Sequence, residues 1–183
     1  ILNNKEVGLP WLGTFHSICA KILRRHAKAV NLNQNFTIID QDDQSRLIKS
    51  ICNAENIDIK KISPNFIISL INKWKNFGWY PENVVLKKSE NLEKNLLKIY
   101  KIYQTKLTDL NACDFGDLIL HCVSIFERNN DINEMYSKNF KYILVDEYQD
   151  TNFIQSKWLK LLTKNHDNIC CVGDDDQSIY SWR

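Results

Sequence analysis

Apolar residues recur every three or four positions along most of the chain, a spacing typical of helices that bury one face. Residues that favour helix starts precede several of these segments: Thr14 and Asp114 suit the N-cap position, and Pro64 suits the first helical position. Gly78 stands where a C-terminal glycine is expected. The pattern therefore predicts helices over residues 14–30, 41–55, 63–78, 91–110, 114–127 and 152–164, with a short helical piece restarting at Pro81.

Shorter apolar runs predict strands. Residues 36–39 form one such run, which ends at Asp40. Residues 142–145 and 168–173 form two more, and both end abruptly in acidic residues. Continuous apolar runs are typical of strands buried on both faces of a parallel sheet. With the helix 152–164 between them, the last two runs predict a βαβ unit with a right-handed crossover.

The segments together predict an α/β domain that carries a helical insertion over about residues 31–113. Asn129 to Asn133, between the helix 114–127 and the strand 142–145, is predicted to be a loop. No internal repeat, low-complexity tract or flexible linker interrupts the chain.

Composition narrows the class of protein. The 183 residues include 24 basic and 22 acidic side chains, so the formal net charge is +2 and any nucleic-acid contact must be local. The chain is 44% hydrophobic and 25% charged, which favours a soluble globular protein. It has no apolar run long enough for a transmembrane helix and no signal peptide. The six cysteines include no C-x-x-C pair, so we expect reduced, structural thiols in a cytoplasmic protein.

The acidic residues after the two apolar runs are the first candidates for chemistry, because ligands bind at the carboxyl ends of parallel strands. Asp146 could hold Mg²⁺, usually through water, and Glu147 could accept a proton from an attacking water. This is the arrangement that a nucleotide hydrolase needs. The alternative is a strand that ends in solvent, with acids that only cap the next helix.

Four motifs resemble those of the superfamily-one DNA helicases of the UvrD, Rep and PcrA type. Val-Asp-Glu-Tyr-Gln-Asp-Thr-Asn at 145–152 resembles the Walker B motif, and the segment 172–183 resembles motif III. Gly-Thr-Phe-His-Ser at 13–17 resembles motif Ib, and 114–119 matches an Asp-Phe-Asp-Asp-Leu-Ile element except that Gly116 replaces an Asp. The resemblance implies a partial RecA-like P-loop NTPase sheet, from residues 1–30 and 114–183, with an all-helical subdomain inserted at 31–113.

The resemblance also implies roles for individual residues. Asp146 would ligate Mg²⁺, Glu147 would activate the water, and Gln177 would sense the γ-phosphate of ATP. The implied cofactors are ATP and Mg²⁺, and the implied partners are single-stranded DNA and the junction between single- and double-stranded DNA. The residues implied to contact DNA are Thr14, His16 and Ser17 near one helix start, and Tyr180, Trp182 and Arg183 in motif III.

Each DNA contact has a structural alternative. Tyr180 and Trp182 could pack in the core rather than stack on bases, and His16 could be a satisfied structural histidine. The basic positions of the first helix could form a solvated face rather than bind phosphate; they are Lys21, Arg24, Arg25 and Lys28. In the insertion, bases and aromatic residues mix near a turn, and the resemblance implies a duplex-contacting subdomain without assigning contacts; these residues are Lys73, Trp74, Lys75, Trp79 and Tyr80.

A phosphate-binding G-x-x-x-x-G-K-[ST] loop is not present in the sequence. Residues 8–13 have the glycine spacing, but Thr14 and Phe15 follow instead of Lys and Thr. We expect the true loop before Ile1 and a second RecA-like domain after Arg183, in a full-length ATP-dependent helicase that moves 3′ to 5′. On this interpretation the isolated chain binds ATP poorly and hydrolyses essentially none.

Two other interpretations remain. The chain could be a non-catalytic DNA- or partner-binding remnant of a decayed helicase gene. It could also be a metal-dependent nuclease, using Asp146, Glu147, Asp174 and Asp176, although the lysine usual at strand spacing in such enzymes is not found.

Overall fold

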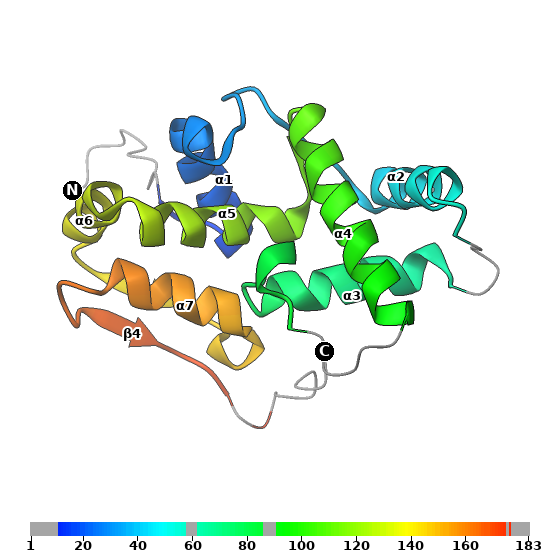
Figure 1. Cartoon of the computed structure of the whole chain (residues 1–183). Helices are drawn as coiled ribbons and strands as arrows, with labels where there is room; N and C mark the ends of the chain where they lie inside the picture. Colours follow the sequence, from blue (N-terminus) through cyan, green and yellow to red (C-terminus); the bar gives the residue numbers. More distant parts are fainter. Residues whose placement is uncertain (1–10, 58–61, 86–90, 175, 177–183) are drawn as a thin grey trace, which may run out of the picture.

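The computed structural model describes residues 11–57, 62–85, 91–174 and 176. This part of the chain is mostly helical and holds two small parallel sheets (Figure 1). The elements in chain order are α1 (Phe15–His26), η1 (Ala27–Val30), β1 (Thr37–Ile38), α2 (Gln41–Ala54), α3 (Pro64–Asn76), η2 (Pro81–Asn83), α4 (Asn91–Asp109), β2 (Ala112–Cys113), α5 (Phe115–Arg128), α6 (Asn130–Asn139), β3 (Ile143–Val145), η3 (Tyr148–Asp150), α7 (Phe153–Leu162) and β4 (Ile169–Cys171).

Side-chain caps fix the helix starts. Thr14 caps α1, as its sequence position predicts, by accepting a hydrogen bond from the Ser17 N–H. Asp114 and Asp117 form a reciprocal capping box at the start of α5, and Asn152 and Gln155 form another at the start of α7. Because Asp114 directly follows β2, its capping box also fixes where the chain leaves that sheet.

The four strands in the described part of the chain form two separate sheets of two strands each. β1 pairs in parallel with β2, and β3 pairs in parallel with β4 with Val145 opposite Cys171. With α7 between them, β3 and β4 confirm the predicted β–helix–β order and its parallel pairing. The expectation that the strand 142–145 is buried on both faces is wrong: Val145 is buried, but Leu144 is 81% exposed because no described element covers its face.

The buried apolar residues form two clusters. One is built by α1, α5 and α7, which pack against one another with Leu23, Phe126 and Trp158 among the buried side chains. The other is built by α2, α3 and α4, with Ile48 and Tyr100 among its members. Figure 1 shows the second group to one side of the first. The two groups meet where α3 packs against α5 and α7.

Three local predictions are corrected. The stretch Asn129 to Asn133 is not a loop: Asn129 is the cap residue before α6, and α6 begins at Asn130 and buries Asn133, Tyr136 and Ser137. The first helix ends at His26 and continues as a 3-10 turn to Val30, because Asn31 adopts the left-handed conformation. The strand β2 lies inside the segment predicted to be nearly all helix.

Within the part of the chain that the structure describes, no helix is both long and apolar enough to span a membrane. All six cysteines are free thiols; Cys19, Cys52, Cys113 and Cys122 are buried, whereas Cys170 and Cys171 are exposed.

Candidate functional site

Asp146 and Glu147 lie directly after β3, and both side chains are exposed. The Asp146 carboxylate accepts a hydrogen bond from the Glu147 N–H at 3.0 Å. Glu147 has φ +52°, in the left-handed region, which is uncommon for a residue with a side chain. This turn carries the chain away from the strand so that two neighbouring carboxylates project beyond the sheet.

Gln149 ties this acidic turn to the neighbouring strand. Its Nε2 donates to Glu147 Oε2 at 2.6 Å, and its Oε1 accepts from the Asp174 N–H at 3.1 Å. The Tyr148 N–H also donates to the Val172 carbonyl at 2.9 Å. The amide of Gln149 therefore fixes the Glu147 carboxylate against the end of β4.

Gly173 makes this approach possible. A Cβ at residue 173 would lie 2.6 Å from Gln149 Oε1 and 3.2 Å from the Gln149 backbone nitrogen. Any larger residue would displace the amide, so a glycine is needed where β4 ends. The sequence shows this glycine and this glutamine inside the two motifs, but only the strand register reveals that they meet.

A cavity of about 540 Å³ borders the acidic turn. Thr14 and His16 line it from α1, and Asp146 and Glu147 line it from the end of β3. The structure therefore brings together residues from two of the motifs that are far apart in the sequence. Residues of α7 complete the wall; they include Gln155, Trp158 and Leu162.

Two of the motif Ib residues predicted to contact DNA already form hydrogen bonds with each other. The Ser17 hydroxyl donates to the Thr14 carbonyl at 2.9 Å, while Thr14 Oγ1 caps the helix. His16 is half-buried with its ring edge-on to Phe115, and burial lowers the pKa of His16. Thr14 and Ser17 are exposed at the helix start, whereas His16 is half-buried beside them. Gln177, Tyr180, Trp182 and Arg183 lie outside the described residues.

The acidic turn fits a magnesium ion held through water. Asp146 offers an exposed carboxylate at the open edge of a parallel sheet, and oxygen ligands with retained waters are what Mg²⁺ prefers. No group of three or more His, Cys, Asp or Glu side chains gathers around a common point in the described ranges.

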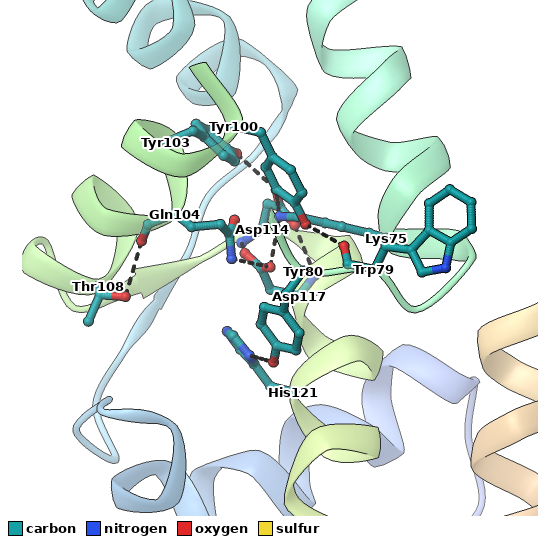
Figure 2. A network of polar contacts seen from close by, with 10 residues as sticks. All are labelled: Lys75, Trp79, Tyr80, Tyr100, Tyr103, Gln104, Thr108, Asp114, Asp117 and His121. Atoms are coloured by element: carbon teal, nitrogen blue, oxygen red, sulfur yellow. Dashed lines mark hydrogen bonds and ion pairs between the residues drawn. The ribbon is translucent and has the colours of Figure 1, made fainter. Parts of the chain in front are cut away.

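A second cluster of charges is buried where α3 and α4 meet α5 (Figure 2). Lys75 Nζ lies 2.6 Å from Asp114 Oδ2 and 2.7 Å from Asp117 Oδ1, and all three side chains are at most 1% exposed. The Tyr103 hydroxyl donates to Asp114 at 2.8 Å, and Gln104 Nε2 donates to Asp117 at 3.0 Å. Lys75, which belongs to the group of bases and aromatic residues near a turn of the insertion, is therefore a buried partner of the α5 capping box.

Burial and pairing act on these charges in opposite directions. Burial alone would lower the pKa of Lys75, but the two carboxylates raise that pKa above its usual range. Burial alone would raise the pKa of Asp117. The opposing effects, led by the charge of Lys75, together outweigh burial, so the net pKa shift is downward. Burial together with the neighbouring Asp117 raises the pKa of Asp114. Lys75 thus lies between two carboxyl groups whose pKa values shift in opposite directions.

Gly116, the departure from the family's Asp-Phe-Asp-Asp-Leu-Ile element, packs on the same lysine. A Cβ at residue 116 would lie 3.0 Å from Lys75 Cδ and 3.4 Å from Asp114 Oδ1. The glycine therefore leaves room for the stem of Lys75 beside the capping box.

His121 continues the cluster one helical turn along α5. Its Nδ1 is 2.6 Å from the Tyr80 hydroxyl, and the two rings stack with centroids 5.8 Å apart. Burial lowers the pKa of His121, an effect that the nearby Asp117 partly opposes. The sequence contains no local signal for this pair, because Tyr80 and His121 lie on separate segments.

The sequence of this chain is similar to those of known proteins. The chain is 44% identical over 175 residues to a probable DNA helicase II homolog of Rickettsia conorii and 43% identical over 182 residues to the ATP-dependent DNA helicase PcrA of Staphylococcus epidermidis. These matches cover 94% and 100% of this chain but 27% and 25% of the relatives, so the chain spans about a quarter of their length. The sequence model of the UvrD/REP helicase N-terminal domain matches residues 1–183. The chain therefore belongs to the UvrD/REP helicase N-terminal domain family.

Proposed function

We propose that the chain is part of an ATP-dependent DNA helicase that moves 3′ to 5′ on single-stranded DNA and unwinds duplexes. The observation that carries the proposal is the acidic turn after β3, where Gln149 fixes Glu147 against β4 beside a cavity shared with Thr14 and His16. Family membership and the names of the relatives, which are DNA helicases, support the same function.

In this proposal the two carboxylates divide the chemistry. Asp146 would hold Mg²⁺ through water, and the ion would neutralise charge on the phosphates of bound ATP. Glu147 accepts the proton of the attacking water, and the amide of Gln149 holds its carboxylate in one orientation. Gln177 completes the set by sensing the γ-phosphate.

DNA contact in the proposal comes from the two ends of the chain. Thr14, His16 and Ser17 meet the backbone of a single strand near the start of α1. Tyr180 and Trp182 stack on its bases, with Arg183 as a nearby cation. Because Thr14 and His16 share a cavity with the acids, DNA and nucleotide would act on one region of the fold.

We further propose that residues 1–30 and 114–183 form a partial RecA-like motor domain and that residues 31–113 form an inserted helical subdomain. The two apolar clusters support this division. The paired strands β1 and β2 lie where the chain enters and leaves the insertion, and Lys75 joins the insertion to the start of α5.

Strand displacement tests the proposal in the protein that carries this chain together with its flanking segments. With ATP and Mg²⁺, a duplex with a 3′ single-stranded tail should be unwound, whereas the same duplex with a 5′ tail should not, because translocation runs 3′ to 5′. Asp146→Asn should abolish unwinding, and Asp167→Asn, at an exposed acid beyond α7, serves as the matched control. Unwinding without ATP, or equal unwinding from a 5′ tail, would refute it.

A further inference from the structure

Three aromatic rings form an exposed group where the end of α3 meets the start of α7. Phe77 and Trp79 stack with centroids 5.2 Å apart and planes at 26°, and Phe153 lies 6.4 Å from Phe77. The exposed fractions are 42% for Phe77, 37% for Trp79 and 58% for Phe153. We name this group the aromatic platform. Aromatic rings this large are normally buried, so three together at the surface indicate a binding role.

The platform is held rigidly by the end of α3. The Trp79 N–H donates to the Trp74 carbonyl at 2.9 Å and the Gly78 N–H to the Lys75 carbonyl at 2.8 Å, which is the hydrogen-bond pattern of a Schellman motif. Gly78 has φ +76°, a conformation that favours glycine. The Trp79 backbone therefore leaves the helix in one fixed direction.

The buried cluster fixes the same backbone from the other side. The Tyr100 hydroxyl donates to the Trp79 carbonyl at 3.0 Å, and the Tyr100 ring stacks on Trp74 with centroids 5.5 Å apart. Figure 2 shows the Trp79 carbonyl facing Tyr100 while the indole points away from the charged cluster. Trp79 thus has an anchored backbone and remains 37% exposed, whereas a core residue would be buried.

The start of α7 is tied to the same place. Asn152 Nδ2 donates to Asn76 Oδ1 at 3.1 Å, and Figure 1 shows the C-terminal end of α3 beside the N-terminal end of α7. Asn152 belongs to the motif that begins with Asp146 and Glu147. The aromatic platform is therefore coupled through one hydrogen bond to the segment that follows the acidic turn.

Cationic side chains line the cavity beside the aromatic platform. A cavity of about 480 Å³ is lined by all three rings and by Arg128 and Lys157. Lys157 lies 2.7 Å from Glu127, which also lines the cavity, so that pair is neutral in sum. Arg128 is exposed, and its guanidinium has no hydrogen bond or ion pair with any residue in the described ranges. The lining therefore combines flat aromatic faces with one net positive charge.

We infer that the aromatic platform is a binding site for single-stranded nucleic acid, in which an unpaired base stacks on Trp79, Phe77 or Phe153 and its phosphate meets Arg128. Every base has a face that can stack on an aromatic ring, and the charge of Arg128 complements phosphate. A duplex keeps its base faces covered and would not use the rings. This inference rests on the proposed function, because it takes single-stranded DNA as the ligand.

Binding of a short fluorescent oligothymidylate to the 183-residue chain, followed by anisotropy, tests the inference. Phe153→Ala and Trp79→Leu should each weaken binding about fivefold to a hundredfold, the usual cost of losing one base stack. Phe66→Ala, at a 51% exposed ring on the same helix α3, is the matched control and should bind as the unmodified chain does. Arg128→Ala should weaken binding and lower its salt dependence, whereas Arg46→Ala, at an exposed residue of α2, should do neither.

Photo-crosslinking of an oligonucleotide that contains 5-bromodeoxyuridine locates the contact. Crosslinks on the peptides that carry Trp79 or Phe153 would support the inference. Unchanged affinity in both ring variants, or crosslinks confined to other peptides, would overturn it. Phe153 is the safer position, because its exposed ring can be removed without opening the core, and circular dichroism verifies that each variant is folded.

The result separates this inference from the proposed function. Ring variants that bind normally, in a protein that still unwinds a 3′-tailed duplex, would refute the platform alone. A protein that shows no ATP-dependent unwinding but binds oligothymidylate through Trp79 and Phe153 would refute the helicase proposal and leave the platform standing. Equal affinity for duplex and single strand, lost equally in Phe153→Ala, would also refute the platform as a single-strand site.

Discussion

Lys75 is the residue on which the buried charge cluster depends. Its ammonium group is the cation that contacts both Asp114 and Asp117, and none of the three side chains is more than 1% exposed. Removing a carboxylate would leave one ion pair intact, whereas removing the lysine would leave two buried carboxyl groups without their cation. A buried ion pair is costly to break because the remaining charge cannot be solvated.

Lys75→Met should therefore lower the free energy of unfolding by about 3–5 kcal/mol, although methionine fills a similar volume. Urea unfolding followed by circular dichroism measures this difference. Lys73→Met, at an exposed lysine two residues away on α3, is the matched control and should change stability by less than about 0.5 kcal/mol. Equal stability of the two variants would show that the cluster contributes nothing to folding.

Three histidines should make the stability depend on pH. Burial lowers the pKa of His16, His26 and His121. In the unfolded chain these residues take up a proton near pH 6.5, whereas in the folded chain they do so only at lower pH. The unfolded state therefore binds more protons in that window, and the free energy of unfolding must fall as the pH falls below about 6.5.

Urea unfolding at about pH 7.5 and about pH 5.5 checks this sign. The chain should be less stable at the lower pH, and replacing the three histidines with glutamine should reduce the difference. A chain that becomes more stable at the lower pH would contradict the burial of neutral histidines.

At the level of elements, local signals were enough to predict most helices and strands. The caps at Thr14 and Asp114 and the apolar runs before Asp146 and Asp174 lie at the predicted places. The start of α6 was missed because two of its three buried positions, Asn133 and Ser137, carry polar residues, and β2 was missed because a strand of two residues has no periodicity. The exposure of Leu144 could not be predicted, because an apolar run does not show what covers each face.

The contact between Gly173 and Gln149 makes the sheet edge sensitive to a single methyl group. In Gly173→Ala the new Cβ would lie 2.6 Å from Gln149 Oε1, so the amide must leave both Glu147 and the Asp174 N–H. We expect a loss of stability of about 1–3 kcal/mol, as for other overpacked sites, and a lower rate of ATP hydrolysis in the complete protein.

Urea unfolding and steady-state ATP hydrolysis measure the two effects of Gly173→Ala. Val172→Ala, at the neighbouring and 57% exposed position, is the control and should retain the rate of hydrolysis. If Gly173→Ala hydrolyses ATP at the unmodified rate, the orientation of Glu147 does not depend on Gln149.

At the scale of the whole molecule, the candidate site is assembled from segments that the sequence keeps apart. Asp146 and Glu147 could be proposed from the sequence, because an apolar run followed by acids is a local pattern. Gln149 and Lys75 could not be assigned their partners, since their contacts depend on strand register and on the packing of α3 against α5. Of the bases and aromatic residues near residue 79, Lys75 and Trp74 are buried in the structure, whereas Lys73 and Trp79 are exposed.

We propose that the acidic turn after β3 carries out ATP hydrolysis in the complete protein. The most direct test is DNA-stimulated ATP hydrolysis by that protein with Glu147→Gln, with ATP affinity measured alongside. We expect the rate to fall on the order of a hundredfold to ten-thousandfold, the usual contribution of a general base, while ATP binding is retained. An unchanged rate of DNA-stimulated hydrolysis in Glu147→Gln would contradict this proposal.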